Sequence, residues 1–452
     1  MDYLRTASGK FICSPAEPFP PVDGEDSTPW NIGFSLVDDL PGRGLNEITK
    51  TRGLIMSAIN KIYFAVALSV CSSASMYGHA ADVIKLGLSV PLSGAGANWG
   101  IGANWLCQQA ASDIAAKGGV NVAGRNYNFE CVAYDNKYNA ADGAKVAQTL
   151  LTKDKVKFIS GSLGTAPVRA LQSLSERRGV LMFTTAWGAS IKGPKFPMTF
   201  TQMNTPNEIV YPLVGFVKER HPAIKTVALL NPNDATGQET EAIARKAWEA
   251  AGVKVVASDW YERGTSEFQP VAAKMAALKP DAVDLCSSTP ADSGQVFKEL
   301  KSLGWDGVKV IEVGTGAGGL LATGGEAAEN TYMGAAVTLE SVNSTPLQHR
   351  LEEGVKSLTG ESINAVQIGF YDSVMALAAA MERAQSVEPG DIAKTLPEVT
   401  FESFYGTSAF GGKSTYGSPQ QVLVPVVVTQ LQQGKLIEVS RIQPEELIKR
   451  VQ

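Results

Sequence analysis

The stretch LGLSVPLSGAGANWGIGANW (Leu86–Trp105) joins a strand to a helix through a loop of glycine, serine and alanine residues. The apolar run at its start is typical of a buried strand, and the segment after the loop is amphipathic. A tryptophan, Trp99, stands inside the loop. Units of the same kind recur along the chain, and their repetition indicates the fold.

Strands and helices are predicted to alternate from residue 82 onward. In the first part of the chain, strands are expected at 83–90, 127–135, 156–162 and 180–185. After residue 203 the pattern restarts, with strands expected at 226–232, 253–261, 282–288 and 308–314. The tail adds a strand at 331–339, helices at 345–360 and 364–385, and a strand–turn–strand at 421–439 that turns at Gln433 and Gly434. The sequence therefore predicts an α/β protein of two doubly wound, Rossmann-like lobes.

The N-terminal region reads as two segments that precede the working protein. Residues 1–55 contain a run rich in proline and acids and show no amphipathic period, so we expect a disordered or mis-assigned upstream segment. Residues 56–81 have the order of a signal peptide: a positive residue, an apolar run at 62–70 too short to span a bilayer, and small residues near a cleavage point at Ala80. A lipid anchor at Cys71 is the less favoured alternative. We therefore expect export to the periplasm.

The composition argues against several functions. The chain has 452 residues, a length that fits two domains. Of these residues 44% are hydrophobic, and the formal net charge is −5. No basic run appears, so no nucleic-acid partner is expected. The sequence holds three histidines, no G-x-S-x-G motif and no His/Cys cluster with metal-binding spacing. We therefore predict a protein that is not an enzyme and that uses no metal or cofactor.

The run GTGAGG (Gly314–Gly319) matches the dinucleotide pattern G-x-G-x-x-G and follows a predicted strand. A dinucleotide-binding turn normally opens the first βα unit of its domain, whereas this run follows the last strand of the second lobe. The helix that should come next is expected to be replaced by LLATGGEAA. A nucleotide-dependent enzyme is therefore only a remote alternative.

Ligands of an open parallel sheet bind at the carboxyl ends of its strands, where successive connections diverge. The loops after the predicted strands are small, hydroxylic and rich in glycine: PLSGAGANWG, SGSLGTA, TTAWGAS, NPNDATG, SSTPADS and EVGTGAGG. Their backbone amides and hydroxyl groups suit an anionic group such as a carboxylate. Trp99 and Trp187 are the large aromatic residues in these loops, and we expect them to pack against the apolar part of a ligand. The alternative for Trp99 is that it closes the core of its own lobe.

Two cysteines are expected to be neighbours in the first lobe. Cys107 lies on the first predicted helix and Cys131 on the second predicted strand. In an oxidising compartment they either form a disulfide, which would stabilise the fold by roughly 3 kcal/mol, or remain two separately buried thiols. Cys286 would stay free.

In their order and spacing, these segments resemble the type I periplasmic solute-binding proteins of ABC importers, specifically the branched-chain amino-acid binding class. VPLSGAGANWG resembles that family's first loop, and the run from AASDIAAKGG to KVAQTLL resembles its helix, strand and second helix. FISGSLGTAPVRAL and RRGVLMFTTAW resemble its third and fourth strand ends, and GFYDSVMALAAAME and QLQQGKLIEV its closing segments. The resemblance covers residues 82–442.

The resemblance implies a Venus flytrap, in which two lobes joined by three crossovers close on one small ligand and then dock on a membrane permease. The N-terminal lobe is expected to comprise 82–203 plus 335–422, and the C-terminal lobe 204–334 plus 423–452. We expect a monomer whose partners are a small-molecule ligand and the permease subunits of an ABC importer. A ligand sensor or regulator on the same fold is the main alternative.

The resemblance also implies a set of ligand-binding residues in the loops at the strand ends. They are Ser93, Trp99, Ser162, Gly164, Thr165, Ala186, Trp187, Gly188, Asp234, Thr289, Glu312 and Gly314. In the first lobe, Thr165 falls at the hydroxyl that holds a carboxylate. In the second lobe, amino-acid binders place an acid to neutralise the ammonium group, but here Glu312 lies one or two places early. Either Asp234 and Asp292 compensate, or the alignment is slipped by one residue and Glu312 is that acid. An amino acid and an aromatic or aliphatic carboxylate both remain open as the ligand.

Overall fold

The structure, a computed structural model, describes residues 81–340 and 344–451, so the predictions about residues 1–80 lie outside it. The described residues belong to one unit that contains two β-sheets. Within the described ranges, no helix is both long and apolar enough to cross a membrane.

The first sheet has nine strands in the order β12-β13-β14-β6-β5-β4-β1-β3-β2. Its strands are β1 (Asp82–Val90), β2 (Val120–Val122), β3 (Arg125–Asp135), β4 (Phe158–Ser162), β5 (Leu181–Thr184), β6 (Thr199–Thr201), β12 (Thr400–Ser403), β13 (Gly406–Gly411) and β14 (Gln421–Leu423). The strands from β14 to β3 pair in parallel, and the antiparallel pairs lie at the two edges.

The second sheet has seven strands in the order β16-β15-β11-β10-β9-β7-β8. Its strands are β7 (Thr226–Pro232), β8 (Lys254–Tyr261), β9 (Ala282–Asp284), β10 (Val308–Ile311), β11 (Tyr332–Met333), β15 (Val426–Gln432) and β16 (Lys435–Ile442). The strands from β8 to β11 are parallel, and the hairpin of β15 and β16, which turns at Gln433 and Gly434, adds an antiparallel edge. That two-residue turn is where the sequence predicts it.

The parallel strands of both sheets follow the same order, 2-1-3-4-5, which is one of the two common doubly wound arrangements. In each sheet the direction of winding reverses beside the first strand, which is β1 in one lobe and β7 in the other. The predicted fold class, two doubly wound α/β lobes, is therefore confirmed.

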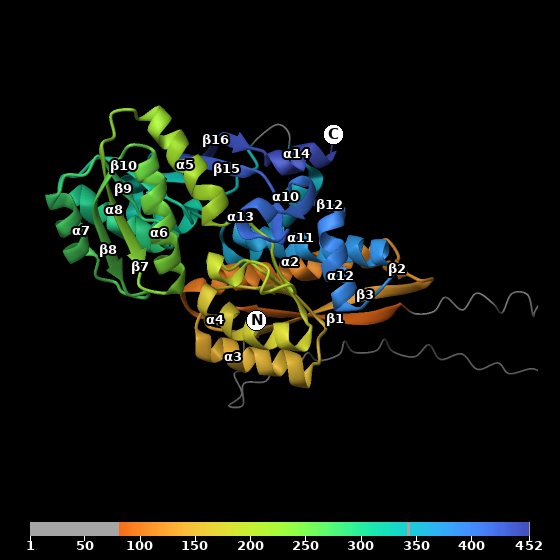
Figure 1. Ribbon diagram of the computed structural model, residues 1–452. Helices are drawn as coiled ribbons and strands as arrows, with labels where there is room; N and C mark the ends of the chain where they lie inside the picture. Colours follow the sequence, from red (N-terminus) through yellow and green to blue (C-terminus); the bar gives the residue numbers. More distant parts are fainter. Residues whose placement is uncertain (1–80, 341–343, 452) are drawn as a thin grey trace, which may run out of the picture. The chain divides into compact units, whose positions relative to one another are not determined.

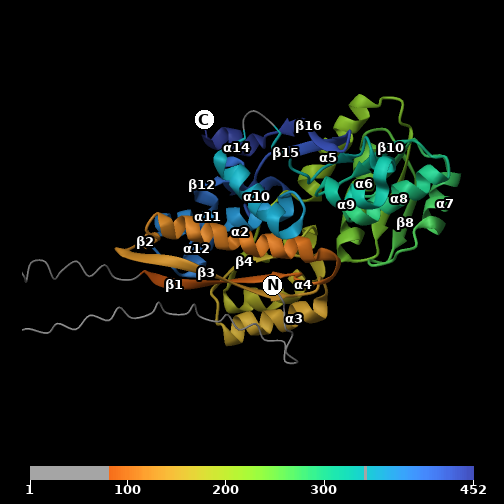
Figure 2. The ribbon, with the colours of Figure 1, turned by 180° about the vertical axis from the view of Figure 1, so that it is seen from behind.

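Helices cover both faces of each sheet, as the alternation of strands and helices requires. The first lobe carries α2 (Ala97–Ala116), α3 (Ala140–Gln148), α4 (Thr165–Ser175), α10 (Pro346–Thr359), α11 (Ala365–Ala384), α12 (Pro389–Thr395) and α13 (Lys413–Tyr416). The second lobe carries α5 (Pro206–Arg220), α6 (Ala235–Ala250), α7 (Gln269–Ala277), α8 (Pro290–Ser302) and α9 (Ala317–Gly324). Helices α2 and α11 lie on one side of β1 and helices α3 and α4 on the other (Figure 1). In the second lobe, α8 and α9 lie side by side (Figure 2).

The strands alternate their apolar side chains between the two helix layers. In β7, Val227 and Leu229 belong to the cluster that includes α5 and α6, whereas Ala228 and Leu230 belong to the cluster that includes α7 and α8. This alternation gives each sheet two buried faces. The loops at the ends of the strands are therefore the parts of each lobe that remain available for a ligand.

Three crossovers connect the two sheets and lie side by side around one small cavity. The chain leaves the first sheet after Thr201, leaves the second after Met333, and passes between them again from Leu423 to Val426. The Asn204 side chain joins the first and third crossovers, because its Nδ2 donates to the carbonyl oxygens of Val424 and Pro425, at 3.1 Å each. The three predicted crossovers are thus present.

The C-terminal helix α14 (Glu445–Val451) returns to the first sheet, although the predicted boundaries assign residues 423–452 to the second lobe. Leu447 packs with Ala409 and Leu423, and the Glu446 carboxylate accepts a hydrogen bond of 2.9 Å from the amide of Gly412. The remaining lobe boundaries, 82–203 plus 335–422 for the first lobe and 204–334 for the second, are still predictions.

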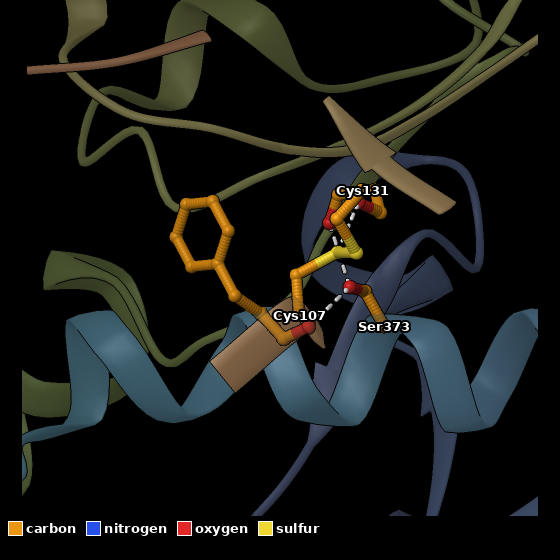
Figure 3. Close-up of a disulfide and its surroundings, with 5 residues drawn as sticks. Cys107, Cys131 and Ser373 are labelled. Atoms are coloured by element: carbon orange, nitrogen blue, oxygen red, sulfur yellow. Dashed lines mark hydrogen bonds between the residues drawn. A yellow bond between two sulfur atoms is a disulfide. The ribbon is translucent and has the colours of Figure 1, made fainter. Parts of the chain in front are cut away.

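Cys107 on α2 and Cys131 on β3 are joined by a disulfide, whereas Cys286 is buried and free. Figure 3 shows the bridge beside Ser373 of α11, whose hydroxyl donates to the carbonyl of Ser160 on β4 at 2.6 Å. The bridge therefore joins α2 to β3, close to the contact between α11 and β4.

Removing the bridge with the pair Cys107→Ala and Cys131→Ala should lower the free energy of unfolding. We expect a loss of about 3 kcal/mol, because the 24-residue separation makes the bridge restrict the unfolded chain. Denaturant unfolding with and without reductant measures it: reduced wild type should lose a similar amount, and the double variant should not respond. Cys286→Ala is the control, and a wild type insensitive to reductant would contradict the bridge.

Asp372 is a buried carboxyl group in α11, 2% exposed, whose Oδ1 accepts a hydrogen bond of 2.7 Å from the amide of Phe404. Burial raises the pKa of Asp372 to about 7. Between the unfolded pKa near 3.8 and this value, the folded state holds the extra proton, so the free energy of unfolding falls as the pH rises through that window.

Asp372→Asn removes this titration while keeping an acceptor oxygen for the Phe404 amide. Relative to wild type, the variant should gain about 1–3 kcal/mol of unfolding free energy on going from pH 5 to pH 8. Urea unfolding at the two pH values measures the change, with the exposed Asp306→Asn as control. An offset that is the same at both pH values would show that Asp372 does not titrate in this range.

Candidate functional site

The candidate site is a cavity of about 20 Å³ between the two lobes, large enough for about one water molecule. Residues from the carboxyl ends of strands in both sheets line it, together with the start of α11. They are Trp99, Tyr138, Leu163, Gly164, Thr185, Trp187, Thr236, Arg263, Ser287, Val313 and Val366. The cavity therefore lies where two doubly wound sheets that face each other would bind a ligand.

The wall from the first lobe offers hydrogen-bond donors. Gly164 precedes α4 with a φ of +92°, a backbone conformation that favours glycine, and in the described part of the chain no side chain caps this helix end. The amides of Thr165 and Ala166 have no acceptor within the helix, because they belong to its first turn. The positive end of the helix dipole thus faces the cavity at Gly164, an arrangement that suits an anion.

Three aromatic side chains enclose the apolar part of the cavity. Trp99, in the first turn of α2, and Tyr138, after β3, have ring centres 6.3 Å apart. Gly100 lets α2 lie close to the loop before it, since a Cβ there would be 1.8 Å from the carbonyl oxygen of Pro91. The third ring belongs to Trp187, which is 5% exposed and whose Nε1 has no acceptor among the described residues. A flat apolar ligand would contact these rings, and the Trp187 N–H is free to donate to it.

The wall from the second lobe is dominated by Arg263, which follows β8. Its Nε donates to Asp234, its Nη2 lies 3.5 Å from the carbonyl oxygen of Ser287, and its Cζ lies 5.2 Å from the centre of the Tyr138 ring. Burial raises the pKa of Tyr138, so its hydroxyl stays protonated under the arginine. Among the residues that the structure describes, Arg263 is the one charged side chain that lines the cavity.

Several polar contacts cross between the lobes around the cavity. The Thr236 hydroxyl donates to Thr165 Oγ1 at 2.9 Å, and Trp99 Nε1 donates to Thr315 Oγ1 at 3.3 Å. These contacts hold the lobes closed directly over the site, so a ligand must break or replace the Thr165–Thr236 bond to enter.

A third contact between the lobes lies at the rim of the cavity. The Glu239 carboxylate, on α6, accepts from the amide of Ser190 at 2.9 Å and from its hydroxyl at 2.8 Å, and it pairs with Arg169 of α4. A Cβ on Gly188 would lie 2.7 Å from both carboxylate oxygens of Glu239, so a larger residue at position 188 would displace that carboxylate. Glu239 is thus a latch between the lobes that does not line the cavity.

The structure brings some of the predicted first-lobe residues to the cavity and places others beside it. Trp99, Gly164 and Trp187 line the cavity, and Thr165 adjoins it through Thr236. Other predicted residues support these: Ser162 donates to the Phe183 carbonyl at 3.2 Å, the Ala186 amide donates to Thr184 Oγ1 at 2.9 Å, and the Gly188 amide donates to Thr165 Oγ1 at 3.3 Å. Ser93 is exposed and donates to Asp135 at 2.6 Å, away from the cavity lining.

The predicted second-lobe residues lie outside the lining. Asp234 caps α6 by accepting from the Gly237 amide at 2.9 Å and also holds Arg263. Thr289 caps α8, and the Asp292 carboxylate accepts from the Tyr261 hydroxyl at 2.9 Å. Gly314 packs against Met333 of β11. The sequence predicts no helix after GTGAGG, and this prediction is wrong. Helix α9 begins at Ala317, inside that run, and continues to Gly324.

Glu312 is fully buried beneath the loops. One carboxylate oxygen of Glu312, one of Asp284 and the sulfur of Cys286 lie within 4.8 Å of one another. Asp284 is held by donors, Trp248 Nε1 at 2.8 Å and the Cys286 amide at 2.9 Å. Burial, together with the negative charge of Asp284, raises the pKa of Glu312 well above its usual range. A protonated Glu312 cannot neutralise an ammonium group, and a proton on this pair accounts for two buried carboxyl groups at such close range.

Sequence reasoning missed the residues that complete the cavity, above all Tyr138, Thr236 and Arg263. Tyr138 follows β3 and Arg263 follows β8, so both stand at carboxyl ends of parallel strands. Ligands of a parallel sheet bind at the carboxyl ends of its strands, so these two loops were candidates as well. They were passed over because their loops are neither small nor rich in glycine.

The chain matches the family described as periplasmic binding protein over residues 83–435. The leucine-, isoleucine-, valine-, threonine-, and alanine-binding protein of Pseudomonas aeruginosa is 26% identical over 357 residues, which span 78% of this chain and 92% of the relative. Among solved structures, the leucine-binding protein LivK from Thermotoga maritima is 19% identical, with a TM-score of 0.67 over 80% of this chain and 100% of that one. A solute-binding protein of an ABC transporter from R. palustris, in complex with benzoate, is 16% identical, with a TM-score of 0.66 over 80% of this chain and 97% of that one.

Glu239→Gln should weaken the closed arrangement, because it removes the negative charge that Arg169 and Ser190 share. Its charge is partly exposed, so we expect a loss of about 0.5–1.5 kcal/mol for closure. Hydrogen exchange of the Ser190 amide should speed up severalfold, and small-angle scattering should show a larger radius of gyration. Glu241→Gln is the matched control, since Glu241 pairs with Arg245 on the same helix. Equal exchange at Ser190 in both variants would contradict the latch.

Proposed function

The chain belongs to the periplasmic binding protein family, and we propose that it is the solute-binding component of an ABC importer. In this role it captures a small carboxylate-bearing ligand, an amino acid or an aromatic or aliphatic carboxylate, between its lobes and delivers it to a membrane permease. The family and the relatives are solute-binding proteins and not enzymes.

The observation that carries the proposal is the uncapped start of α4, which opens on a cavity lined by aromatic rings between two lobes joined by three crossovers. A carboxylate there would accept from the free amides at the helix start and from the Thr165 hydroxyl. The apolar remainder of the ligand would lie against Trp99, Tyr138 and Trp187. Hinge closure would then bring the second lobe over it.

The names of similar proteins keep two ligand classes within this proposal. The Pseudomonas aeruginosa relative is named for leucine, isoleucine, valine, threonine and alanine, and the R. palustris structure contains benzoate. Both kinds of compound carry the carboxylate that the first lobe is suited to hold. The two classes differ at the other end of the ligand, which would face the second lobe.

Export to the periplasm and release of a signal segment are part of the proposal. The relatives are periplasmic binding proteins, and residues 56–81 have the order of a signal peptide. The oxidised pair Cys107 and Cys131 agrees with folding in an oxidising compartment. Action as a monomer and docking on permease subunits stay predictions.

Thr165→Val should weaken the binding of any carboxylate that the protein recognises. We expect a loss of roughly 10- to 150-fold, because a hydrogen bond to a charged group is removed. A thermal-shift screen of amino acids and carboxylates identifies a ligand, since binding to the folded state raises the melting temperature. Titration calorimetry of that ligand with wild type and variant then measures the loss.

Thr240→Val is the control for this test, because it deletes a buried hydroxyl that bonds only to the Thr236 carbonyl within α6 among its described contacts. Equal affinity of wild type and Thr165→Val would remove Thr165 from the site. A screen in which only neutral or cationic compounds raise the melting temperature would overturn the carboxylate proposal altogether.

A further inference from the structure

We propose that the second lobe selects a ligand by its far end, and that Arg263 binds an oxygen acceptor there. The ligand class is an aromatic acid that carries a hydroxyl or a second carboxylate opposite its first carboxylate and has no ammonium group. This inference rests on the proposed function, because it takes the first carboxylate to be held by the first lobe.

Arg263 has hydrogen-bonding capacity to spare. A guanidinium group has five N–H donors, of which Nε is used by Asp234 and one on Nη2 points to the Ser287 carbonyl. Its Nη1 makes no hydrogen bond to any residue in 81–340 or 344–451. The group lines the cavity and lies over the Tyr138 ring, so its free N–H groups are available to a ligand that rests against that ring.

Among the residues that the structure describes, none offers an ammonium group a free carboxylate at this end of the cavity. Asp234 is occupied by Arg263 and by the amide of Gly237. Asp292 accepts from Tyr261, and Glu312 is fully buried beside Asp284 rather than in the lining. A positively charged amine would instead meet the positively charged guanidinium, and the two would repel each other.

Both walls of the cavity therefore donate hydrogen bonds. The first lobe contributes the start of α4 and the N–H of Trp187, and the second contributes Arg263. A ligand that fits between two donor walls has acceptors at both ends, and the rings of Trp99, Tyr138 and Trp187 favour a flat core between them. A hydroxylated or dicarboxylic aromatic acid has this form.

One rearrangement would reverse the selection. If Arg263 turned out of the cavity, the Asp234 carboxylate would be free to pair with the ammonium group of an amino acid. Asp234→Asn separates the two cases, because asparagine also caps a helix start and keeps the hydrogen bond from the Gly237 amide.

The experiment measures affinities by titration calorimetry for two matched sets of compounds. The first set is benzoate, para-hydroxybenzoate and terephthalate, which differ in the far end. The second set is tyrosine and its desamino analogue, hydroxyphenylpropanoate, which differ in the ammonium group. In wild type we expect para-hydroxybenzoate or terephthalate to bind more tightly than benzoate, and the desamino analogue to bind more tightly than tyrosine.

Arg263→Gln should weaken the compounds with a far-end oxygen roughly 10- to 150-fold more than it weakens benzoate, because only they lose a charged hydrogen bond, whereas the charge of the unpaired Asp234 acts on the carboxylate that all the compounds share. Arg263→Lys keeps the charge without the planar fork, and it should fall between wild type and Arg263→Gln. Arg245→Gln, whose arginine pairs with Glu241 on α6, is the matched control and should bind as wild type does. The melting temperature of each unliganded variant verifies folding, and Arg263→Lys carries the test if Arg263→Gln fails to fold.

Tighter binding of tyrosine than of its desamino analogue, abolished by Asp234→Asn and not by Arg263→Gln, would overturn this inference and leave the proposed function standing. Equal weakening of benzoate and para-hydroxybenzoate by Arg263→Gln would also overturn it, because the arginine would then act on the shared carboxylate. If wild type binds no carboxylate of either set and none in the wider screen, the proposed function fails and the inference fails with it.

Discussion

One side chain, Asn204, holds two of the three crossovers together by donating to the carbonyls of Val424 and Pro425, and the rest of the molecule depends on this joint. Each sheet has its own helix layers, but one buried apolar cluster runs from the first lobe into α5, α6 and β7 of the second. The crossovers lie side by side around a small cavity, and a hinge movement of the proposed kind would bend the chain there. The ligand cavity is a result of this geometry, since neither lobe encloses it alone.

The two lobes share a strand order, yet they present different kinds of hydrogen-bond donor to the cavity. The first lobe presents backbone amides at a helix start, which no substitution of a side chain can remove. The second lobe presents a side chain, Arg263, whose direction is set by its ion pair with Asp234. With the proposed carboxylate held by the first lobe, an exchange of side chains in the second lobe would change which ligand is selected.

Much of the fold and a smaller part of the site were readable from the sequence. The alternation of strands and helices predicted both lobes, the family resemblance is confirmed by the match over residues 83–435, and Trp99, Gly164 and Trp187 do line the cavity. Tyr138 and Arg263 were missed although they also follow parallel strands, because the sequence criterion was a loop of small residues rich in glycine and their loops do not meet it. Glu312 is fully buried close to Asp284, which lies on another strand of the sheet, so no local pattern reveals its burial. The apolar run around Val424 and Pro425 looks like one strand, and only pairing partners show that it joins two sheets.

The disulfide has a consequence for how a ligand is held. It fastens α2, which carries Trp99, to β3, which leads into Tyr138, so the covalent link fixes the two elements that position this aromatic pair. Folding of the first lobe alone therefore brings the backbone segments of the two rings together, and less backbone ordering is left to accompany the binding of a ligand of the proposed class.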